Sequence, residues 1–488
     1  MTLQKTQEYL LSIVHELCKL PNETEWVEFK YNKAVPEDIG EYISALSNSA
    51  SLLGKVNAYL VWGINDTDHS IIGTDFQPSK AKKGSEELEN WLLKLLNPKI
   101  NFSFFEINIA EKNIVLLEIS ATIRTPVQFK NQEYIRIGSY KKKLKEYPEK
   151  ERELWRIFDK TPYESLVAVD NISSDEVLKN LNYPAYFDLL NIPLPSNKDG
   201  ILEALLAEKM ITKSESGLWN IMSLGAILFA KKLSDFDILK RKAVRVVVYR
   251  GKGRIETIRE REGAKGYASG FEGLIDFIKT LLPLNEVIEK ALRKSVPMYP
   301  ELAIREVVAN AIIHQDFEVT GSGILVEIFD DRMEITNPGT PLVETERFLD
   351  SPPQSRNEAL ASFMRRIGVC EERGSGIDKI VFESEHYQLP APLFEVTNNH
   401  TRTTLFAHKE YKHMDKQDRI RATYLHSCLR YVEKDYMTNS TLRERFGIEE
   451  RNSAMVSRVI KETTQAEQIK PFDPTTSKKY MKYIPWWV

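Results

Sequence analysis

The chain has 488 residues, of which 67 are Lys or Arg and 70 are Asp or Glu, so its formal charge is −3. At about 100–200 residues per domain, this length predicts three or four domains. The hydrophobic content of 42% excludes a largely disordered chain. No apolar run approaches the ~20 residues of a membrane span. Three separated cysteines without a CxxC pair argue against a disulfide framework, and we expect a cytoplasmic protein.

The near-neutral total charge hides an uneven distribution along the chain. Residues 409–488 carry 16 Lys and Arg against 11 Asp and Glu, a net charge of +5. The preceding residues therefore carry a net charge of −8. A basic tail on an acidic body indicates a nucleic-acid contact at one end of the chain.

Residues 1–150 have the pattern of a mixed α/β domain. A helix is predicted from Pro36, where proline and acidic residues stand at the start as helix N-termini prefer. Strands are predicted at residues 58–64, 100–109, 114–119 and 134–137. A basic run, Lys141–Lys145, closes the domain.

An acidic constellation lies at the start of this domain. Glu28 and Lys30 are two residues apart and share one face of an extended strand. Glu23 could join them only from a loop or a bent strand, and Asp66 follows the predicted strand 58–64. Converging carboxylates suit Mg²⁺ or Mn²⁺, since hard cations take oxygen ligands. The alternative is a solvated acidic stretch with a turn at Asp66.

Four segments together resemble the Schlafen-type AlbA_2 domain over about residues 20–145. They are ExxxxEFK at residues 23–30, the helix half SNSAS, the strand ending GIND and the following IIGTDF. The resemblance implies a metal-dependent nuclease site at Glu23, Glu28 and Asp66, with Lys30 stabilising the phosphate charge. Many bacterial relatives are taken to bind DNA without cutting it, so the resemblance also fits a binding domain.

Residues 151–296 are predicted to form a connecting region of helices around a strand at 243–249, and residues 297–410 a further α/β domain. The segment 298–317 has apolar residues at helical spacing, and Glu306 and Asn310 lie one turn apart on its other face. Two strands around an Asp-Asp-Arg turn follow, then an irregular stretch from about residue 340. Gly374, Ser375 and Gly376 precede a helix, where backbone N–H groups could approach a phosphate or simply form a turn.

These elements, in this order, resemble the GHKL ATP-binding fold in its divergent form attached to AlbA_2 domains. The resemblance implies that Glu306 activates water and that Asn310 is a Mg²⁺ ligand. Asn337–Gly339 falls where the family's adenine-contacting Asp-x-Gly lies, and an Asn can still accept through its carbonyl oxygen. Gly374, Ser375 and Gly376 match a phosphate loop, and Arg356 and Asn357 sit in a lid-like stretch. His314, at the helix end, is expected to cap the helix or lie near phosphate.

Residues 411–488 are predicted to form helix, short helix, helix and a terminal hairpin, an order that resembles a winged helix-turn-helix. Such modules bind nucleic acid, and they also serve as protein–protein or dimer modules. The basic residues expected to attract phosphate are Lys141, Lys142 and Lys143 in the first domain and Arg443, Arg445, Arg451, Arg458, Lys461, Lys478, Lys479 and Lys482 in the last.

The sequence therefore predicts a multidomain α/β protein: AlbA_2 domain, connecting region, GHKL-like α/β sandwich and winged helix. The leading hypothesis is an ATP-gated, metal-dependent nuclease acting on RNA or DNA. Fold-level analogy suggests a role in antiphage defence. The ATP is either hydrolysed or only bound to set a conformation. The alternative is a non-catalytic, ATP-responsive transcriptional regulator, and a third reading makes the tail an assembly module. Both resemblances imply a homo-oligomer, a dimer or larger.

Overall fold

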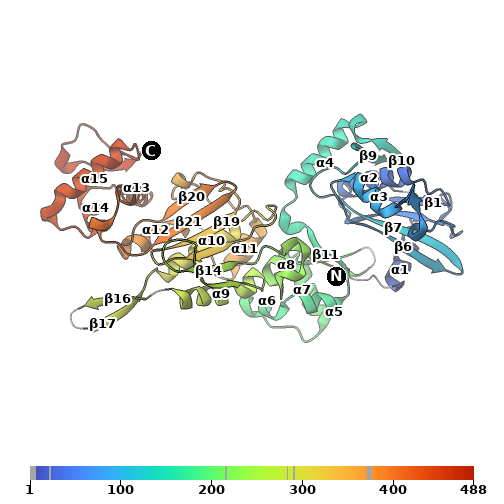
Figure 1. Cartoon of the computed structure of the whole chain (residues 1–488), viewed down its shortest axis with the longest axis horizontal. Helices are drawn as coiled ribbons and strands as arrows, with labels where there is room; N and C mark the ends of the chain where they lie inside the picture. Colours follow the sequence, from blue (N-terminus) through green and yellow to red (C-terminus); the bar gives the residue numbers. More distant parts are fainter. Residues whose placement is uncertain (1–6, 21–23, 215–216, 283, 290–291, 371–375) are drawn as a thin grey trace. The chain divides into compact units, whose positions relative to one another are not determined.

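The computed structural model describes residues 7–20, 24–214, 217–282, 284–289, 292–370 and 376–488 (Figure 1). The chain divides into two compact units, Met1–Ile172 with Lys213–Asn220, and Ser173–Thr212 with Ile221–Val488. The four predicted domains subdivide the chain more finely than these units. Among the described residues, no helix combines the length and the apolar composition needed to cross a membrane.

The first unit is built on a four-stranded sheet in the order β1-β2-β7-β6, in which β1 runs parallel to β2 and the other pairs are antiparallel. A second small sheet has the order β10-β9-β8-β5. Its helices and strands are α1 (Gln7–Cys18), β1 (Val27–Lys30), α2 (Pro36–Leu52), β2 (Asn57–Trp62), β3 (Lys82–Lys83), β4 (Glu86–Glu87), α3 (Leu88–Leu95), β5 (Leu96–Asn97), β6 (Phe102–Ile109), β7 (Lys112–Ser120), β8 (Gln128–Phe129), β9 (Gln132–Ile137), β10 (Tyr140–Lys143), α4 (Pro148–Lys160) and β11 (Val167–Ile172).

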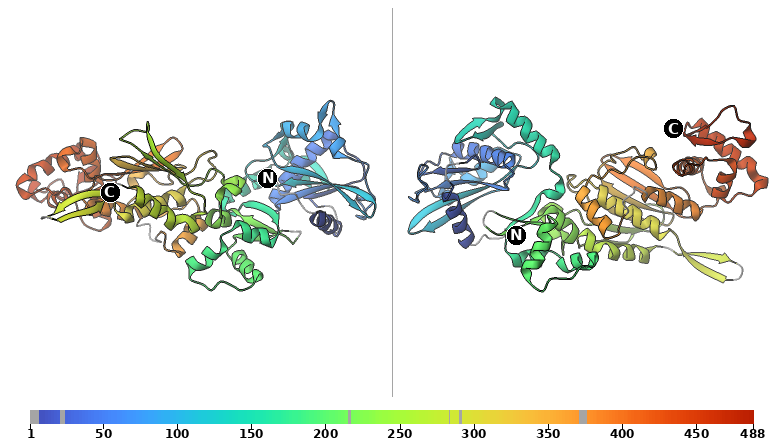
Figure 2. Two further views of the ribbon diagram at one scale, coloured as in Figure 1. Left: turned by 60° about the horizontal axis from the view of Figure 1, so that its bottom comes forward. Right: turned by 180° about the vertical axis from the view of Figure 1, so that it is seen from behind.

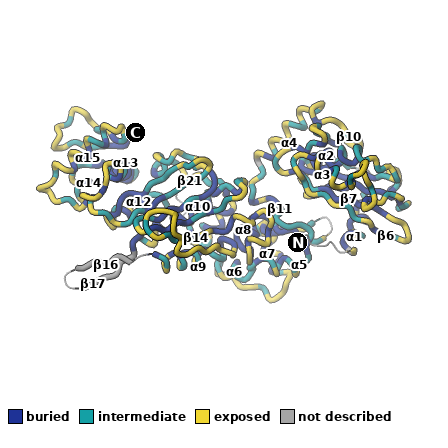
Figure 3. The backbone as a smooth tube through the Cα atoms, in the orientation of Figure 1, coloured by how far each residue is buried: buried dark blue, intermediate teal, exposed yellow. Residues whose placement is uncertain are grey.

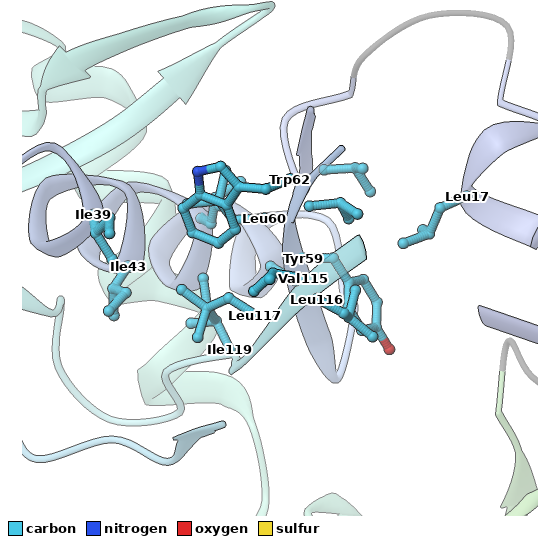
Figure 4. Close-up of a cluster of buried hydrophobic side chains, with 14 of the residues drawn as sticks. Leu17, Ile39, Ile43, Tyr59, Leu60, Trp62, Val115, Leu116, Leu117 and Ile119 are labelled. Atoms are coloured by element: carbon cyan, nitrogen blue, oxygen red, sulfur yellow. The ribbon is translucent and has the colours of Figure 1, made fainter. Parts of the chain in front are cut away.

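Helix α2 joins these two sheets. Its apolar residues Ile39 and Ile43 are buried in the hydrophobic cluster formed with β2 and β7 (Figure 4). Its small polar half, SNSAS, instead forms hydrogen bonds with β9 and with the residue before β8: the Asn48 amide donates to the Tyr134 carbonyl at 2.8 Å, and the Val127 N–H donates to Asn48 Oδ1 at 2.7 Å. The SNSAS sequence therefore fixes β8 and β9 against the helix, because only short polar side chains leave the backbones close enough to bond.

The second unit contains a six-stranded sheet in the order β15-β14-β18-β19-β21-β20. Helix α10 packs against β19 and between α9 and α12, and Figure 3 shows it as a buried layer of the unit. Two strands, β12 (Ile211–Lys213) and β13 (Trp219–Met222), include residues of both units. The other elements before the C-terminal residues are α5 (Ser174–Asn180), α6 (Tyr183–Leu190), α7 (Lys198–Ala207), α8 (Ser223–Phe229), β14 (Arg245–Tyr249), β15 (Thr257–Glu262), α9 (Tyr267–Leu281), β16 (Leu284–Glu289), β17 (Leu292–Pro297), α10 (Glu301–His314), β18 (Leu325–Ile328), β19 (Arg332–Pro338), α11 (Glu358–Arg366), α12 (Gly376–His386), β20 (Leu393–Thr397) and β21 (His400–Phe406).

Residues 411–488, here called the C-terminal module, follow the predicted order of helices and hairpin (Figure 2). The short helix α14 starts with a capping box at Thr438 and ends at Gly447, whose φ of +63° is the left-handed conformation expected of a glycine stop. The module's elements are α13 (Lys416–Val432), α14 (Asn439–Phe446), α15 (Ser453–Gln465), β22 (Ile469–Pro471) and β23 (Tyr483–Pro485). The predicted mixed α/β fold class is confirmed, while the winged-helix assignment stays a prediction.

Candidate functional site

A cavity of about 320 Å³ lies in the second unit. Residues of α10, β19, α12, β21 and a loop of residues 340–357, here called the rim loop, form its walls. Four residues predicted from the sequence line this cavity: Glu306, Asn310, Asn337 and Gly376. Their segments are far apart in the chain, so the fold gathers them into one place.

Glu306 and Asn310 face the first residue of α12. Glu306 is only 5% exposed, although it carries a carboxylate. A Cβ atom added at Gly376 would lie 2.8 Å from Glu306 Oε2 and 3.7 Å from Asn310 Oδ1. Only glycine leaves this space open, and the two side-chain oxygens converge on it. Their donor chemistry fits a hard cation such as Mg²⁺.

The opposite wall is formed by the end of β19. Asn337 is 6% exposed and its amide nitrogen donates to the Pro338 carbonyl at 3.1 Å. Gly339 follows with a φ of +98°, and a Cβ atom there would lie 2.8 Å from the Cβ atom of Asp316. The glycine is required both by its backbone conformation and by this close approach.

Arg356 and Asn357 hold the end of the rim loop and do not line the cavity. The Asn357 amide donates to the carbonyls of Ile313 at 2.8 Å and Gln315 at 2.9 Å, which ties the start of α11 to the end of α10. Arg356 donates to the Thr340 carbonyl at 2.7 Å, closing the two ends of the loop on each other. The predicted residues Gly374 and Ser375 lie outside the described residues.

Several cavity residues carried no local signal in the sequence. Beside the cavity, the Lys379 ammonium lies 3.7 Å from Glu306 Oε1, one helical turn after Gly376. Cys370 also lines the cavity, and burial raises the pKa of its thiol to about 11. Thr401 and Thr403 come from β21. The only local hint was for Lys379, a lysine in the first turn of a helix that begins with glycine. The places of the other residues at the cavity depend on packing between distant segments.

His314 stands at the end of α10 and lines the same cavity. Burial lowers the pKa of its imidazole, and the nearby Arg356 guanidinium lowers it further. The ring is therefore neutral near pH 7. A neutral imidazole carries no charge that could interact with the helix dipole at the C-terminus. A charged cap, one of the two roles expected of His314, is therefore not available to it.

The first unit holds its buried acid differently. The Glu28 side chain is 2% exposed, and Lys30 and Arg136 both form ion pairs with it. The Tyr42 hydroxyl donates to the same carboxylate at 2.8 Å. Burial acts to lower the pKa of Lys30, but the Glu28 carboxylate outweighs it and the pKa is raised. Lys30 and Arg136 therefore already pair with the carboxylate that a metal ion would need as a ligand.

Of the other two acids of the predicted set, only Asp66 is among the described residues. Asp66 lies exposed beyond the end of β2, with the Thr67 hydroxyl at 3.4 Å from its Oδ1. Glu23 lies outside the described residues. Within the described ranges, no three His, Cys, Asp or Glu side chains cluster as a metal ion would require. The described acids therefore do not fit a divalent metal in this arrangement.

The predicted basic residues fall into two groups. Lys141 is held by Glu41 at 2.5 Å and by Asp38 at 3.2 Å, and Arg445 is only 4% exposed. Arg445 was expected to attract phosphate, and its burial against Glu385 corrects that expectation. Arg443 is half-buried. The residues at exposed positions are Lys142, Lys143, Arg451, Arg458, Lys461, Lys478, Lys479 and Lys482.

Two protein families match parts of the chain. Residues 23–145 match the Schlafen AlbA_2 family, as predicted. Residues 321–405 match the family described as "Putative ATP-dependent DNA helicase recG C-terminal". The second match begins after α10, so the placement of Glu306 and Asn310 in the cavity comes from geometry. No curated protein matches the chain.

Two solved structures are similar to the chain. The DIP2311 protein from Corynebacterium diphtheriae is 17% identical, with 98% of this chain and 97% of that chain covered and a TM-score of 0.41. The N-terminal domain of a "Putative ATP-dependent DNA Helicase RecG-related Protein" from Nitrosomonas europaea is 19% identical. That match covers 28% of this chain and 92% of the domain, with a TM-score of 0.20.

Proposed function

We propose that this chain, which contains a Schlafen AlbA_2 domain and a recG C-terminal type domain, is an ATP-binding protein that acts on nucleic acid. One observation carries the ATP site: Glu306, Asn310, Asn337 and Gly376 line a single cavity of about 320 Å³. Small-molecule sites begin at about 300 Å³. The description of the family that matches residues 321–405 names an ATP-dependent DNA helicase, which supports the proposal.

The cavity has polar groups from three elements, α10, β19 and α12, that suit a nucleotide. Asn337, at the end of β19, would accept from the adenine amino group through its carbonyl oxygen. Glu306, Asn310 and the N-terminus of the 11-residue helix α12 would face the phosphates. A Mg²⁺ ion bound with the nucleotide would neutralise phosphate charge, with Asn310 as a ligand. Glu306 would orient a water and take its proton.

Calorimetric titration of the full chain with ATP and Mg²⁺ tests this site. Asn310→Ala should weaken binding about 10-fold or more, a loss of ~1.4 kcal/mol, because a ligand oxygen is removed. Glu306→Gln should retain binding and lose hydrolysis. Glu358→Gln is the matched control, since Glu358 is exposed at the start of α11. Unchanged affinity in Asn310→Ala, or no binding by the unmodified chain, would overturn the proposal.

Nucleic-acid binding is proposed at the exposed basic residues of the C-terminal module. Arg458 and Lys461 stand on α15, and Lys478 and Lys479 stand in the loop between β22 and β23. Backbone contacts of this kind give an affinity that falls steeply with salt. Replacing Lys478 and Lys479 by Glu should lower affinity for DNA or RNA and reduce the salt dependence. A salt slope equal to that of the unmodified chain would contradict this surface.

The second candidate is a metal-dependent nuclease with a role in defence, supported by the Schlafen AlbA_2 match over residues 23–145. The occupied Glu28 carboxylate argues against it, so we rank the ATP-responsive nucleic-acid binder first. Incubation of tRNA, single-stranded RNA and DNA with Mg²⁺ or Mn²⁺, with and without ATP, separates the two. Cleavage that Glu28→Ala and Asp66→Ala both abolish would establish the nuclease.

A further inference from the structure

Two walls of the nucleotide cavity have a second side that contacts the C-terminal module. The rim loop lines the cavity through Pro341, Phe348 and Ser355, and helix α12 lines it through Gly376 and Ile380. On the side away from the cavity, both walls are covered by protein. Leu349 of the rim loop and Val381 of α12 belong to one buried hydrophobic cluster with residues of α13, α14 and α15.

The rim loop is fastened to the module by polar contacts. The Tyr424 hydroxyl donates to the Glu346 carbonyl at 2.6 Å, and the Trp487 indole donates to Tyr424 at 3.2 Å. The Arg347 guanidinium lies 4.5 Å from the centre of the Trp487 ring, within the range of a cation–π contact. Phe348, the next residue, lines the cavity. The cavity wall is thus one residue away from its anchor on the module.

The far end of α12 is fastened more deeply. Glu385 accepts from the His426 ring at 2.9 Å and lies 3.5 Å from the buried Arg445 guanidinium. Arg445 also donates to the Leu389 carbonyl at 2.7 Å. Because Gly376 begins the same helix, a displacement of α12 at the cavity moves residues held by the module. A helix is a stiff connection, so the displacement is passed along its length.

We propose that the C-terminal module is a positioning element of the nucleotide cavity, with Tyr424 and Trp487 holding the rim loop and Glu385, His426 and Arg445 holding α12. The inference rests on the proposed ATP binding and adds to it. Nucleotide affinity depends on how the module is docked. By linkage, a nucleotide changes the module's affinity for nucleic acid by the same factor that nucleic acid changes the affinity for nucleotide.

The test uses the full chain and three variants that leave the cavity lining intact. Tyr424→Phe removes one hydroxyl, and Arg347→Ala removes the guanidinium over Trp487. Tyr436→Phe is the matched control, because Tyr436 lies in the same module and packs on Phe472, 4.6 Å between ring centres. ATP binding should weaken about 5-fold or more in the first two variants. It should be unchanged in Tyr436→Phe.

Hydrogen exchange distinguishes this positioning role from a merely structural one. ATP should slow exchange in α13 of the unmodified chain, and Tyr424→Phe should remove that protection while α10 stays protected. Thermal unfolding of each variant confirms that it is folded. If the unmodified chain binds ATP and both variants bind it equally well, this inference is overturned and the proposed function stands. If the unmodified chain does not bind ATP, the proposed function fails first.

Discussion

The two units each bury a glutamate, and the two surroundings differ. Glu28 is enclosed by Lys30, Arg136 and Tyr42, all of them supplied by the chain. Glu306 lines a cavity, with Lys379 at 3.7 Å and a glycine that keeps the adjoining space open. A buried carboxylate whose charge is balanced within the fold is costly to leave unpaired. One beside an open, polar cavity is placed to meet a ligand.

The two family resemblances also differ in how the structure arranges the residues that they predicted. Both predicted sites contained acids at the expected spacing. In the second unit four predicted residues share one cavity, whereas in the first unit Glu28 pairs with Lys30 and Arg136 and Asp66 is exposed. Spacing in the sequence therefore places residues on elements, and the neighbours of each side chain decide what it can do.

The largest expected effect concerns Arg136. Arg136→Ala would leave Glu28 buried with one cation fewer, and breaking a buried ion pair costs about 3–5 kcal/mol of unfolding free energy. Chemical denaturation measures the loss. Lys142→Ala, on the neighbouring strand at an exposed position, serves as control and should change stability by less than ~0.5 kcal/mol. A loss below ~1 kcal/mol for Arg136→Ala would show that the Glu28 cluster is not a stabilising one.

A glycine in each unit sharpens the contrast. In the first unit, a Cβ atom at Gly40 would collide with the buried ring of Phe129. Gly40→Ala should lower the unfolding free energy by about 1–3 kcal/mol, because the ring is fixed in the core. Gly273→Ala, where the added atom meets open space in a helix, should instead be neutral or stabilising. Thermal unfolding of both variants compares them directly.

In the second unit, Gly376→Ala should act on binding more than on stability. The added Cβ atom would lie 2.8 Å from the end of the Glu306 side chain, which can rotate away. We expect a change in unfolding free energy below ~1 kcal/mol and an ATP affinity reduced about 10-fold, which is ~1.4 kcal/mol. Calorimetry and thermal unfolding on the same preparation measure both. A large stability loss without a binding defect would contradict the assignment of this space to ligand.

The smallest effect is a pH dependence at His314. Its pKa is lowered in the folded protein from the ordinary 6.5, so the unfolded chain binds the proton more readily. Stability should fall as the pH drops below about 6.5, by at most about 1.4 kcal/mol per pH unit for this group. His314→Asn should flatten part of that fall. Thermal unfolding at pH 7.5 and 5.5 tests it, and parallel curves for the two proteins would refute the assignment.

Much of the fold could be predicted from local patterns. The strand expected at residues 100–109 is present as Phe102–Ile109, and the short helix before Gly447 is present too, because strand patterns and a left-handed glycine are properties of neighbouring residues. The Glu306–Asn310 pair was also predictable, since one helical turn fixes the shared face. The role of the SNSAS sequence was not, because the hydrogen-bond partners of Asn48 lie more than 70 residues away.

The sequence by itself determined the order of elements, the two family resemblances and the basic end of the chain, because these depend on composition and short-range spacing. Only the tertiary structure decided the partners of each charge. It placed Arg136 on Glu28, 108 residues away, and buried Arg445 against Glu385. A charged residue has the same spacing whether it faces solvent, a counterion or a ligand, and only packing between distant segments distinguishes these cases.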